Sequence, residues 1–310
     1  MRPSIRRIQL VAILATVLAT AALGTACGGD DETDDSGQVK VTATLGLFAD
    51  LVQRVGGDRV DVSTLVPGGT DVHTYEPPPS AIATLGRAKL VVMNGLHLEG
   101  ALEDVIGENV SSSATLLALA EDLPTIQQAQ PEHPDELDNP HLWLDVKNGM
   151  TYVERIRDAL ASIDPAGADV YRANADAYLA ELRTLDQEVT AAVESIPPER
   201  RKLVTFHDAY HYLARGYGLQ IVGVVVESPG QEPSAQDVAD LTQAIDDEGV
   251  PAVFTEPQFS ARILELAADD ADVDVCVLYS DAFSDDVQSY VDLMRSNALE
   301  LARCLGGSSG

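Results

Sequence analysis

Three histidines and one aspartate of this chain have the residue types of a metal site: His73, His141, His207 and Asp281. Three imidazole nitrogens and one carboxylate oxygen are the donor set of a closed tetrahedral site without thiolate ligands. We expect each of the four to lie where a strand gives way to a loop. Because they come from both halves of the chain, the sequence predicts a metal held between two lobes.

Composition and charge narrow the classes of partner. The chain has 310 residues, of which 45% are hydrophobic, so it can bury a core, and its length favours two lobes over one domain. Fifty acidic against 20 basic residues give a net charge of −30. This charge argues against nucleic acid or an anionic membrane surface as a partner, since both bind basic patches. It favours cations, and acidity that serves only solubility or life in a salty or exposed environment is the alternative.

Short β-branched runs alternate with longer amphipathic segments in both halves of the chain. In the first half, strands are predicted at residues 39–45, 60–66, 89–94 and 114–118, with helices at 47–55 and 80–87. In the second half, strands are predicted at 202–206, 220–226, 252–255 and 273–278, with helices at 208–217, 235–248 and 260–268. This alternation predicts an α/β fold with a parallel sheet in each lobe, built from right-handed crossovers.

A long helix is predicted between the lobes, at residues 165–196. Its apolar residues recur at three- or four-residue steps, at Tyr171, Ala175, Tyr178, Leu182, Leu185 and Val189. At ~1.5 Å per residue the helix would be roughly 45 Å long, and Pro197 and Pro198 end it. We therefore expect an N-terminal lobe at 39–164, this rigid linking helix, a C-terminal lobe at 197–305 and a flexible tail at 306–310.

The N-terminus has the pattern of an export signal. Three arginines precede an apolar stretch, and small residues follow up to Cys27. A cysteine just after such a cleavage point resembles the bacterial lipoprotein box, although Gly24 stands where that box prefers an aliphatic residue. We expect a lipoprotein signal peptide at 1–26, a lipid anchor at Cys27 on the outer face of the cytoplasmic membrane or a periplasmic location, and an acidic flexible tether at 27–38. Ordinary cleavage with release is the alternative.

Three of the candidate ligands lie near the predicted carboxyl ends of strands, where open α/β sheets bind small ligands. His73 lies in the long loop after the strand at 60–66, His207 directly follows the strand at 202–206, and Asp281 lies just beyond the last strand. His141 follows a loop rich in proline and acidic residues, from which it can reach the same cleft.

Six motifs carry a family resemblance: GTDVHTYEPPP (69–79), NPHLWLD (139–145), FHDAYHYL (206–213), FTEPQF (254–259), YSD (279–281) and YVDLMRSN (290–297). Together they resemble the zinc and manganese solute-binding proteins of ABC importers, over nearly the whole chain from residue 39 to 305. The resemblance implies two α/β lobes bridged by a long helix, with metal in the cleft on His73, His141, His207 and Asp281. It also implies a monomer that is not an enzyme, and an ABC permease with its ATPase as partners.

The donor set favours Zn²⁺ as the transported metal, because imidazole suits zinc whereas manganese prefers more oxygen donors. Manganese-specific members of the family tend to have a carboxylate at the position of His207, and Mn²⁺ is the alternative. Zinc-binding members of the family often carry a His-rich acidic loop before the second ligand. Here the corresponding segment, residues 127–139, is acidic but has a single histidine, His133.

Three acidic residues are predicted to orient ligand histidines by accepting the second ring N–H: Glu76, Asp145 and Glu256. Salt bridges within loops are the alternative for them. His211 lies four residues after His207, as in a zinc-protease helix, but Asp208 stands where that pattern needs glutamate. We interpret His211 as a surface residue or a neighbour of the ligands, and His97 as a turn residue.

The cysteine count predicts a disulfide. If Cys27 is lipidated, Cys276 and Cys304 remain as a pair in an exported lobe, where oxidation is favoured. Their bond would join the last predicted strand to the final helix.

Two functions from other classes stay open. A zinc hydrolase would hold the metal on three histidines and use Asp281 as a base, which requires an open coordination position. A lipid-anchored adhesin would keep the metal only for structure, so that removing it would unfold the protein. A closed site of four protein ligands instead favours capture and delivery.

Overall fold

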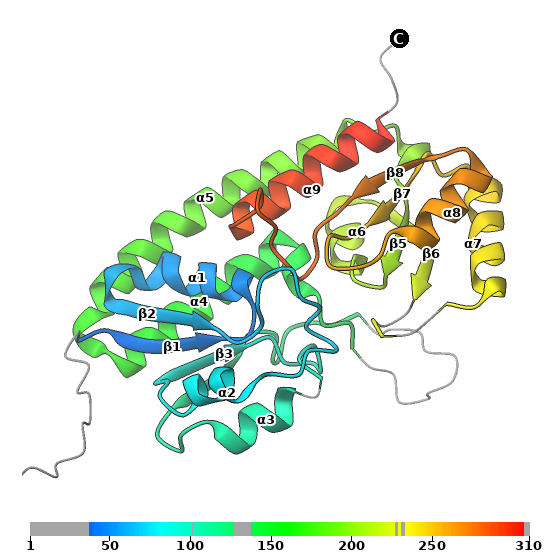
Figure 1. The fold of residues 1–310 in the computed structure, drawn as a ribbon. Coiled ribbons are helices and arrows are strands. Elements are labelled where there is room, and N and C mark those ends of the chain that lie inside the picture. The colour runs from blue at the N-terminus through cyan, green and yellow to red at the C-terminus, as the bar shows by residue number, and fades with distance from the viewer. Residues whose placement is uncertain (1–36, 101, 127–137, 227–228, 231–232, 307–310) are drawn as a thin grey trace, which may run out of the picture. The chain divides into compact units, whose positions relative to one another are not determined.

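Two four-stranded parallel sheets form the centres of two lobes (Figure 1). The computed structural model describes residues 37–100, 102–126, 138–226, 229–230 and 233–306. The chain from Gln38 onward forms one unit. The predicted α/β fold with two lobes and a long linking helix is confirmed.

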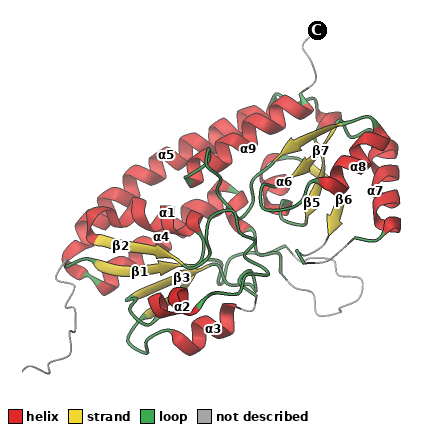
Figure 2. Ribbon diagram, viewed as in Figure 1, coloured by secondary structure: helices red, strands yellow, loops and turns green. Residues whose placement is uncertain are grey.

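The N-terminal lobe has the strand order β2-β1-β3-β4. Its strands are β1 (Val39–Ala43), β2 (Val60–Thr64), β3 (Leu90–Met93) and β4 (Thr115–Ala118). Its helices are α1 (Gly46–Gly56), α2 (Pro79–Leu85), α3 (Leu102–Asn109) and α4 (Val146–Ile163). Helices α1 and α4 pack against each other on one face of the sheet, and α2 and α3 lie together on the other (Figure 2).

The C-terminal lobe has the corresponding strand order β6-β5-β7-β8. Its strands are β5 (Lys202–His207), β6 (Gln220–Val226), β7 (Ala252–Thr255) and β8 (Asp274–Val277). Its helices are α6 (His211–Tyr217), α7 (Ala235–Glu248), α8 (Arg262–Ala271) and α9 (Tyr290–Leu305). Each predicted strand is present within two residues of its predicted ends.

The position of β7 inside its sheet explains why its first three residues, Ala252, Val253 and Phe254, are all apolar. Val253 joins the hydrophobic cluster formed with α7 and α8. Its neighbours Ala252 and Phe254 face the other way, into the main cluster with α6 and α9. A strand in a parallel sheet with helices on both faces has no solvent side, so both sets of alternating side chains must be apolar.

The linking helix α5 (Ala168–Glu194) has 27 residues and packs on both lobes. Its predicted apolar stripe is buried against α1 and α4 of the first lobe and against α9 of the second. Figure 1 shows α5 and α9 running side by side. Within the described residues, no helix has both the length and the apolar character needed to cross a membrane.

The described residues also form four short 3₁₀ helices, and two of them flank α5. They are η1 (Gly57–Arg59), η2 (Leu142–Leu144), η3 (Pro165–Gly167) and η4 (Pro198–Arg200). The prolines at the start of η3 and η4 carry no N–H group, which a first helical turn does not need. The prediction of one helix from 165 to 196 is therefore corrected by a few residues at each end.

Candidate metal centre

His73 lies in the loop between β2 and α2, and Asp71 holds that loop. One oxygen of the Asp71 carboxylate accepts the backbone N–H of His73 at 3.0 Å, and the other accepts the hydroxyl of Thr74 at 2.6 Å. This is the local turn that an aspartate forms with the backbone two residues on. It presents the His73 ring from a segment without regular secondary structure.

His141 directly precedes the 3₁₀ turn η2, so the prediction that it follows a strand was wrong. The Asn-Pro-His sequence positions it instead. The side-chain oxygen of Asn139 lies 3.0 Å from Nδ1 of His141. Because an amide oxygen can only accept, Nδ1 carries the proton and Nε2 is left with a free lone pair. Asn139 was missed in the sequence, although it opens one of the family motifs.

Asn139 also ties the two lobes together beside His141. Its side-chain nitrogen donates to the carbonyl of Asp208 at 2.6 Å, and its own carbonyl accepts the hydroxyl of Tyr212 at 2.8 Å. Both partners belong to the C-terminal lobe. The position of His141 is therefore coupled to the segment that follows His207.

His207 is the last residue of β5, and Glu256 fixes its ring. Nδ1 of His207 lies 2.7 Å from a carboxylate oxygen of Glu256, which directly follows β7. The other oxygen of Glu256 accepts hydrogen bonds from Ser280 and from Gln258, the latter at 3.2 Å. The contact predicted for Glu256 is present, and it orients the His207 ring with Nε2 towards the other donors.

Asp281 completes the cluster from the loop beyond β8. Its carboxylate oxygens lie 3.5 Å from Nε2 of His73, 3.5 Å from Nε2 of His141 and 3.8 Å from Nε2 of His207. The Nε2 atoms of His141 and His207 are 3.3 Å apart. One donor atom from each residue lies within 4.8 Å of all the others, so the four donors surround one point.

Burial and missing partners show that this point suits a cation. Nε2 of His73 and both carboxylate oxygens of Asp281 are buried and have no hydrogen-bond partner in the described structure. Buried polar atoms are normally satisfied, and an unsatisfied carboxylate is especially costly. A divalent ion at the shared point would satisfy all of these atoms.

The protonation states of the histidines differ because their neighbours differ. Burial lowers the pKa of His141 well below its usual range, so its ring is neutral. Burial also acts to lower the pKa of His207, but the Glu256 carboxylate outweighs it and raises the pKa to about 9. Burial acts to raise the pKa of Asp281, but the surrounding histidines, with the protonated His207 among them, outweigh it and hold the pKa below its usual range. A metal must therefore displace a proton from His207.

Two of the predicted orienting residues do not have that role in the structure. Asp145 caps the N-terminus of α4, where its side chain accepts the backbone N–H of Lys147 at 3.0 Å. Glu76 is exposed and makes no hydrogen bond or ion pair with a histidine among the described residues. Asp145 has a different role because the side chain of an aspartate that precedes a helix accepts hydrogen bonds from the free backbone N–H groups of the first turn.

Among the described residues, His97 and His211 stand apart from the four donors. His211 pairs with Asp208 at 2.5 Å, and His97 is exposed and lies 3.0 Å from Glu103. His133 and Cys27 fall outside the described residues. In the C-terminal lobe the structure joins Cys276 of β8 to Cys304 of α9 by a disulfide.

Comparison with known proteins places this geometry in a family. A family model described as "ZnuA: Zinc-uptake complex component A periplasmic" matches residues 41–304. The chain is 33% identical over 287 residues to the manganese-binding lipoprotein MntA of Halalkalibacterium halodurans, covering 91% of this chain and 94% of that one. It is 32% identical over 259 residues to the zinc-binding protein TroA of Treponema pallidum, covering 83% of each.

Solved structures of metal-binding proteins have a similar fold. The periplasmic zinc-binding protein TroA of Treponema pallidum superposes with a TM-score of 0.81 at 30% identity, covering 87% of this chain and all of that one. A Mn-bound periplasmic metal-binding protein of Candidatus Liberibacter asiaticus has a TM-score of 0.78 at 26% identity, covering 86% of this chain and all of that one. The descriptions of these similar proteins name zinc for TroA and manganese for MntA and the Liberibacter protein.

Proposed function

The chain belongs to the zinc-uptake complex component A family of metal solute-binding proteins, and from this premise we propose that it captures Zn²⁺ outside the cytoplasm and delivers it to an ABC permease. Members of the family bind divalent metals for ABC import and are not enzymes. The hydrolase alternative is therefore dropped. Beyond family membership, we propose the identity of the metal, the ligand residues and the lipid anchor.

One observation carries the proposal: three imidazoles and one carboxylate converge on a buried point, with Nε2 of His73 and both oxygens of Asp281 left without hydrogen-bond partners. We assign His73, His141, His207 and Asp281 as the four ligands. Four protein donors close a tetrahedral zinc site, so no position is left for a water nucleophile. Capture and release fit this arrangement better than catalysis.

The choice of zinc rests on the donor types. Three nitrogen ligands and one carboxylate suit zinc, whereas manganese prefers about six ligands, most of them oxygen atoms. The alternative cargo is Mn²⁺, which Asp281 could hold through both carboxylate oxygens. The names of the relatives support both metals, since MntA is called manganese-binding and TroA zinc-binding.

A competition experiment tests the cargo. The protein is stripped with a chelator, and Zn²⁺ and Mn²⁺ are titrated against each other while thermal unfolding is followed. We expect one tight equivalent with zinc preferred, and a metal-free protein that stays folded. Manganese that holds the site against equimolar zinc would contradict the zinc assignment. Metal-free protein that is unfolded would favour the adhesin alternative, in which metal is structural.

A matched pair of histidine variants tests the ligands. His207→Ala removes a donor and should weaken zinc binding by orders of magnitude. His97→Ala removes an exposed ring that is paired with Glu103 on the surface, so it should leave the affinity unchanged. Equal affinities of the two variants would remove His207 from the ligand set.

The proposed anchor is a lipid on Cys27, which would hold the protein near its permease and ATPase. Relatives such as MntA are named lipoproteins. Expression of the full chain and of Cys27→Ala in bacteria, followed by membrane fractionation, tests this proposal. We expect the full chain in the membrane fraction and the variant in the soluble exported fraction. The same distribution for both would contradict lipidation at Cys27.

A further inference from the structure

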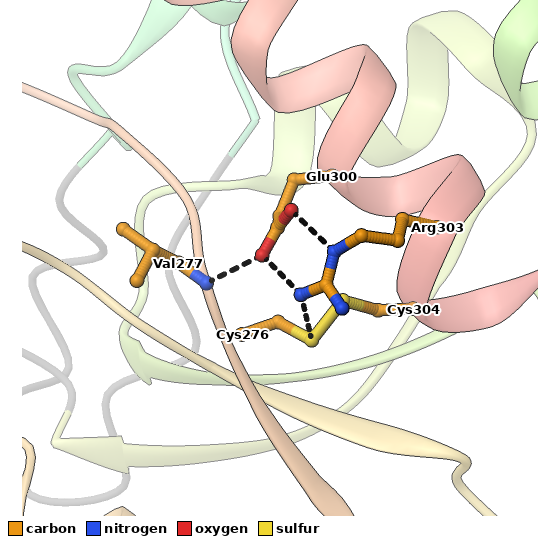
Figure 3. The surroundings of a disulfide bond; sticks show 5 residues. All are labelled: Cys276, Val277, Glu300, Arg303 and Cys304. Carbon is orange, nitrogen blue, oxygen red and sulfur yellow. Dashed lines mark hydrogen bonds and ion pairs between the residues drawn. A yellow bond between two sulfur atoms is a disulfide. The ribbon is translucent and has the colours of Figure 1, made fainter. Parts of the chain in front are cut away.

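A second group of metal-binding residue types lies in the C-terminal lobe, away from the four-donor cluster. Cys276 on β8 and Cys304 on α9 form the disulfide, and Glu300 lies one helical turn before Cys304 (Figure 3). Residues four apart on a helix share a face, so Glu300 and Cys304 both point at the strand. The two sulfurs and a carboxylate oxygen all lie within 4.8 Å of one another.

Glu300 is held in place by groups from both elements. Its carboxylate accepts the backbone N–H of Val277 at 3.4 Å and the guanidinium of Arg303 at 2.6 and 2.9 Å. These hydrogen bonds, with Arg303 first among them, hold the pKa of Glu300 below its usual range. The carboxylate is therefore ionised beside the sulfurs.

Arg303 also contacts the disulfide itself. Its Nη2 atom lies 3.4 Å from Sγ of Cys276. Figure 3 draws this contact as a dashed line. A cation beside a sulfur stabilises the thiolate, which is both the leaving form in disulfide exchange and the form that binds metal. A plain structural disulfide needs neither the carboxylate nor the guanidinium.

We propose that this disulfide masks a second metal site, in which reduced Cys276 and Cys304 bind a thiophilic divalent ion such as Zn²⁺ or Cd²⁺ together with Glu300. A dithiol reductant supplies the two electrons and two protons that convert the disulfide into two thiols, and is itself oxidised to a disulfide. Metal binding then forms two metal–sulfur bonds and releases the two thiol protons.

The ligand chemistry of this site differs from that of the cargo site. Two thiolates and one carboxylate suit zinc and cadmium and disfavour manganese, which prefers oxygen donors. A carboxylate has about four lone-pair positions, so Glu300 can bind the metal and keep Arg303. The side chain of Arg303 is largely exposed, so water can reach a fourth position. In the oxidised protein the sulfurs are bonded to each other and only the cargo site binds.

Metal counting on the full chain tests the proposal. Cd²⁺ is titrated into the protein before and after reduction with a phosphine, which removes the disulfide without adding competing thiols. We expect the count to rise from one equivalent to two, with thiolate-to-metal charge-transfer absorption for the second only. The result does not depend on the cargo proposal, because in His207→Ala the reduced protein should still gain one such equivalent.

Two sets of variants separate this site from adventitious thiol binding. Cys276→Ser with Cys304→Ser should give the same count with and without reductant. Glu300→Gln should weaken binding of the second metal equivalent at least about tenfold. Even the loss of a residue that only contacts a metal ligand typically lowers metal affinity about 10–100-fold. Glu188→Gln is the matched control, because Glu188 pairs with Arg295 at 2.9 Å on the surface as Glu300 does with Arg303.

Four results would overturn the proposal. They are a reduced, folded protein that binds one equivalent, a second equivalent that persists in the double serine variant, equal affinities of Glu300→Gln and Glu188→Gln, and loss of far-ultraviolet circular dichroism on reduction. The last result would mean that the folded arrangement of β8 and α9 does not exist without the disulfide.

Discussion

Trp143 donates a hydrogen bond from its indole Nε1 to the main-chain carbonyl of Ser280 at 3.0 Å, and this bond joins the two lobes at the metal centre. Trp143 lies two residues after His141, and Ser280 directly precedes Asp281. The carbonyl of Trp143 in turn accepts the hydroxyl of Tyr290 at 2.6 Å. The Trp143 side chain therefore links the segment that carries His141 to the residue before Asp281.

Replacing Trp143 with phenylalanine should weaken metal binding through Asp281. Phenylalanine keeps an aromatic ring in the buried site but removes the N–H that holds the Ser280 carbonyl. Loss of one buried hydrogen bond, about 1–2 kcal/mol, corresponds to roughly a 5- to 30-fold weaker affinity. Chelator competition gives the affinity of each variant.

A double-mutant cycle shows whether Trp143 acts by positioning the carboxylate. In an Asp281→Asn background, Trp143→Phe should have a much smaller effect than in the wild-type protein. Equal effects in the two backgrounds would mean that Trp143 supports the fold in general and has no specific link to Asp281.

Glu256 is expected to tune His207 as a ligand. Glu256→Gln can still accept the Nδ1 proton but loses the charge that makes the ring basic. Removal of such an outer partner typically costs about 10–100-fold in metal affinity. The control is Asp145→Asn, which removes a carboxylate whose side chain caps α4 and does not contact a histidine in the described structure. The prediction fails if the two variants bind zinc equally well.

Zinc binding should release a proton from His207 at neutral pH. The pKa of His207 is raised to about 9, chiefly because the Glu256 carboxylate outweighs the effect of burial, so the metal-free ring is protonated at pH 7. Metal and proton compete for Nε2, and the affinity should therefore rise about tenfold per pH unit from 7 to 9 and level off above. Calorimetry in two buffers with different ionisation enthalpies counts the protons. A count of zero at pH 7 contradicts this protonation state.

The sequence predicted the elements of the fold well because their periodicity is local. β7 matches its prediction in both ends, and the apolar stripe of α5 is buried as expected. The helix α4 was not predicted, although Val146, Val153 and Ile156 have helical spacing. Gly149 interrupts that pattern, and the structure gives its reason: a side chain there would collide with Tyr290 of α9.

The surroundings of the candidate site were harder to predict, because they depend on contacts between distant segments. The convergence of the four donors followed from strand ends and the family motifs. The pairing of His141 with Asn139 is local but was hidden by the more obvious acidic residues. Asp145 has the right residue type and lies four residues from His141, yet the first turn of α4 uses its carboxylate.

Glu99 is a buried carboxylate that lies outside the metal centre. One of its oxygens accepts the hydroxyl of Thr44 at 2.9 Å and the backbone N–H of Asn94 at 2.7 Å, and the other accepts the N–H of Gly95 at 3.1 Å. These bonds tie the ends of β1 and β3 together. Burial outweighs them and raises the pKa of Glu99 from 4.5 to about 7.

The raised pKa predicts that stability falls as the pH rises from about 4.5 to 7. In this interval the folded protein keeps a proton on Glu99 that the unfolded chain has lost, so each increase in pH favours unfolding. At 1.36 kcal/mol per pKa unit, the shift from 4.5 to about 7 amounts to about 3 kcal/mol. Glu99→Gln does not titrate. Urea unfolding of the metal-free proteins from pH 4.5 to 8 should therefore show wild type losing about 3 kcal/mol relative to this variant, with no further change above pH 8. Stability curves that run parallel for the two proteins would mean that Glu99 is ionised throughout, and that its hydrogen bonds to Thr44, Asn94 and Gly95 compensate fully for burial.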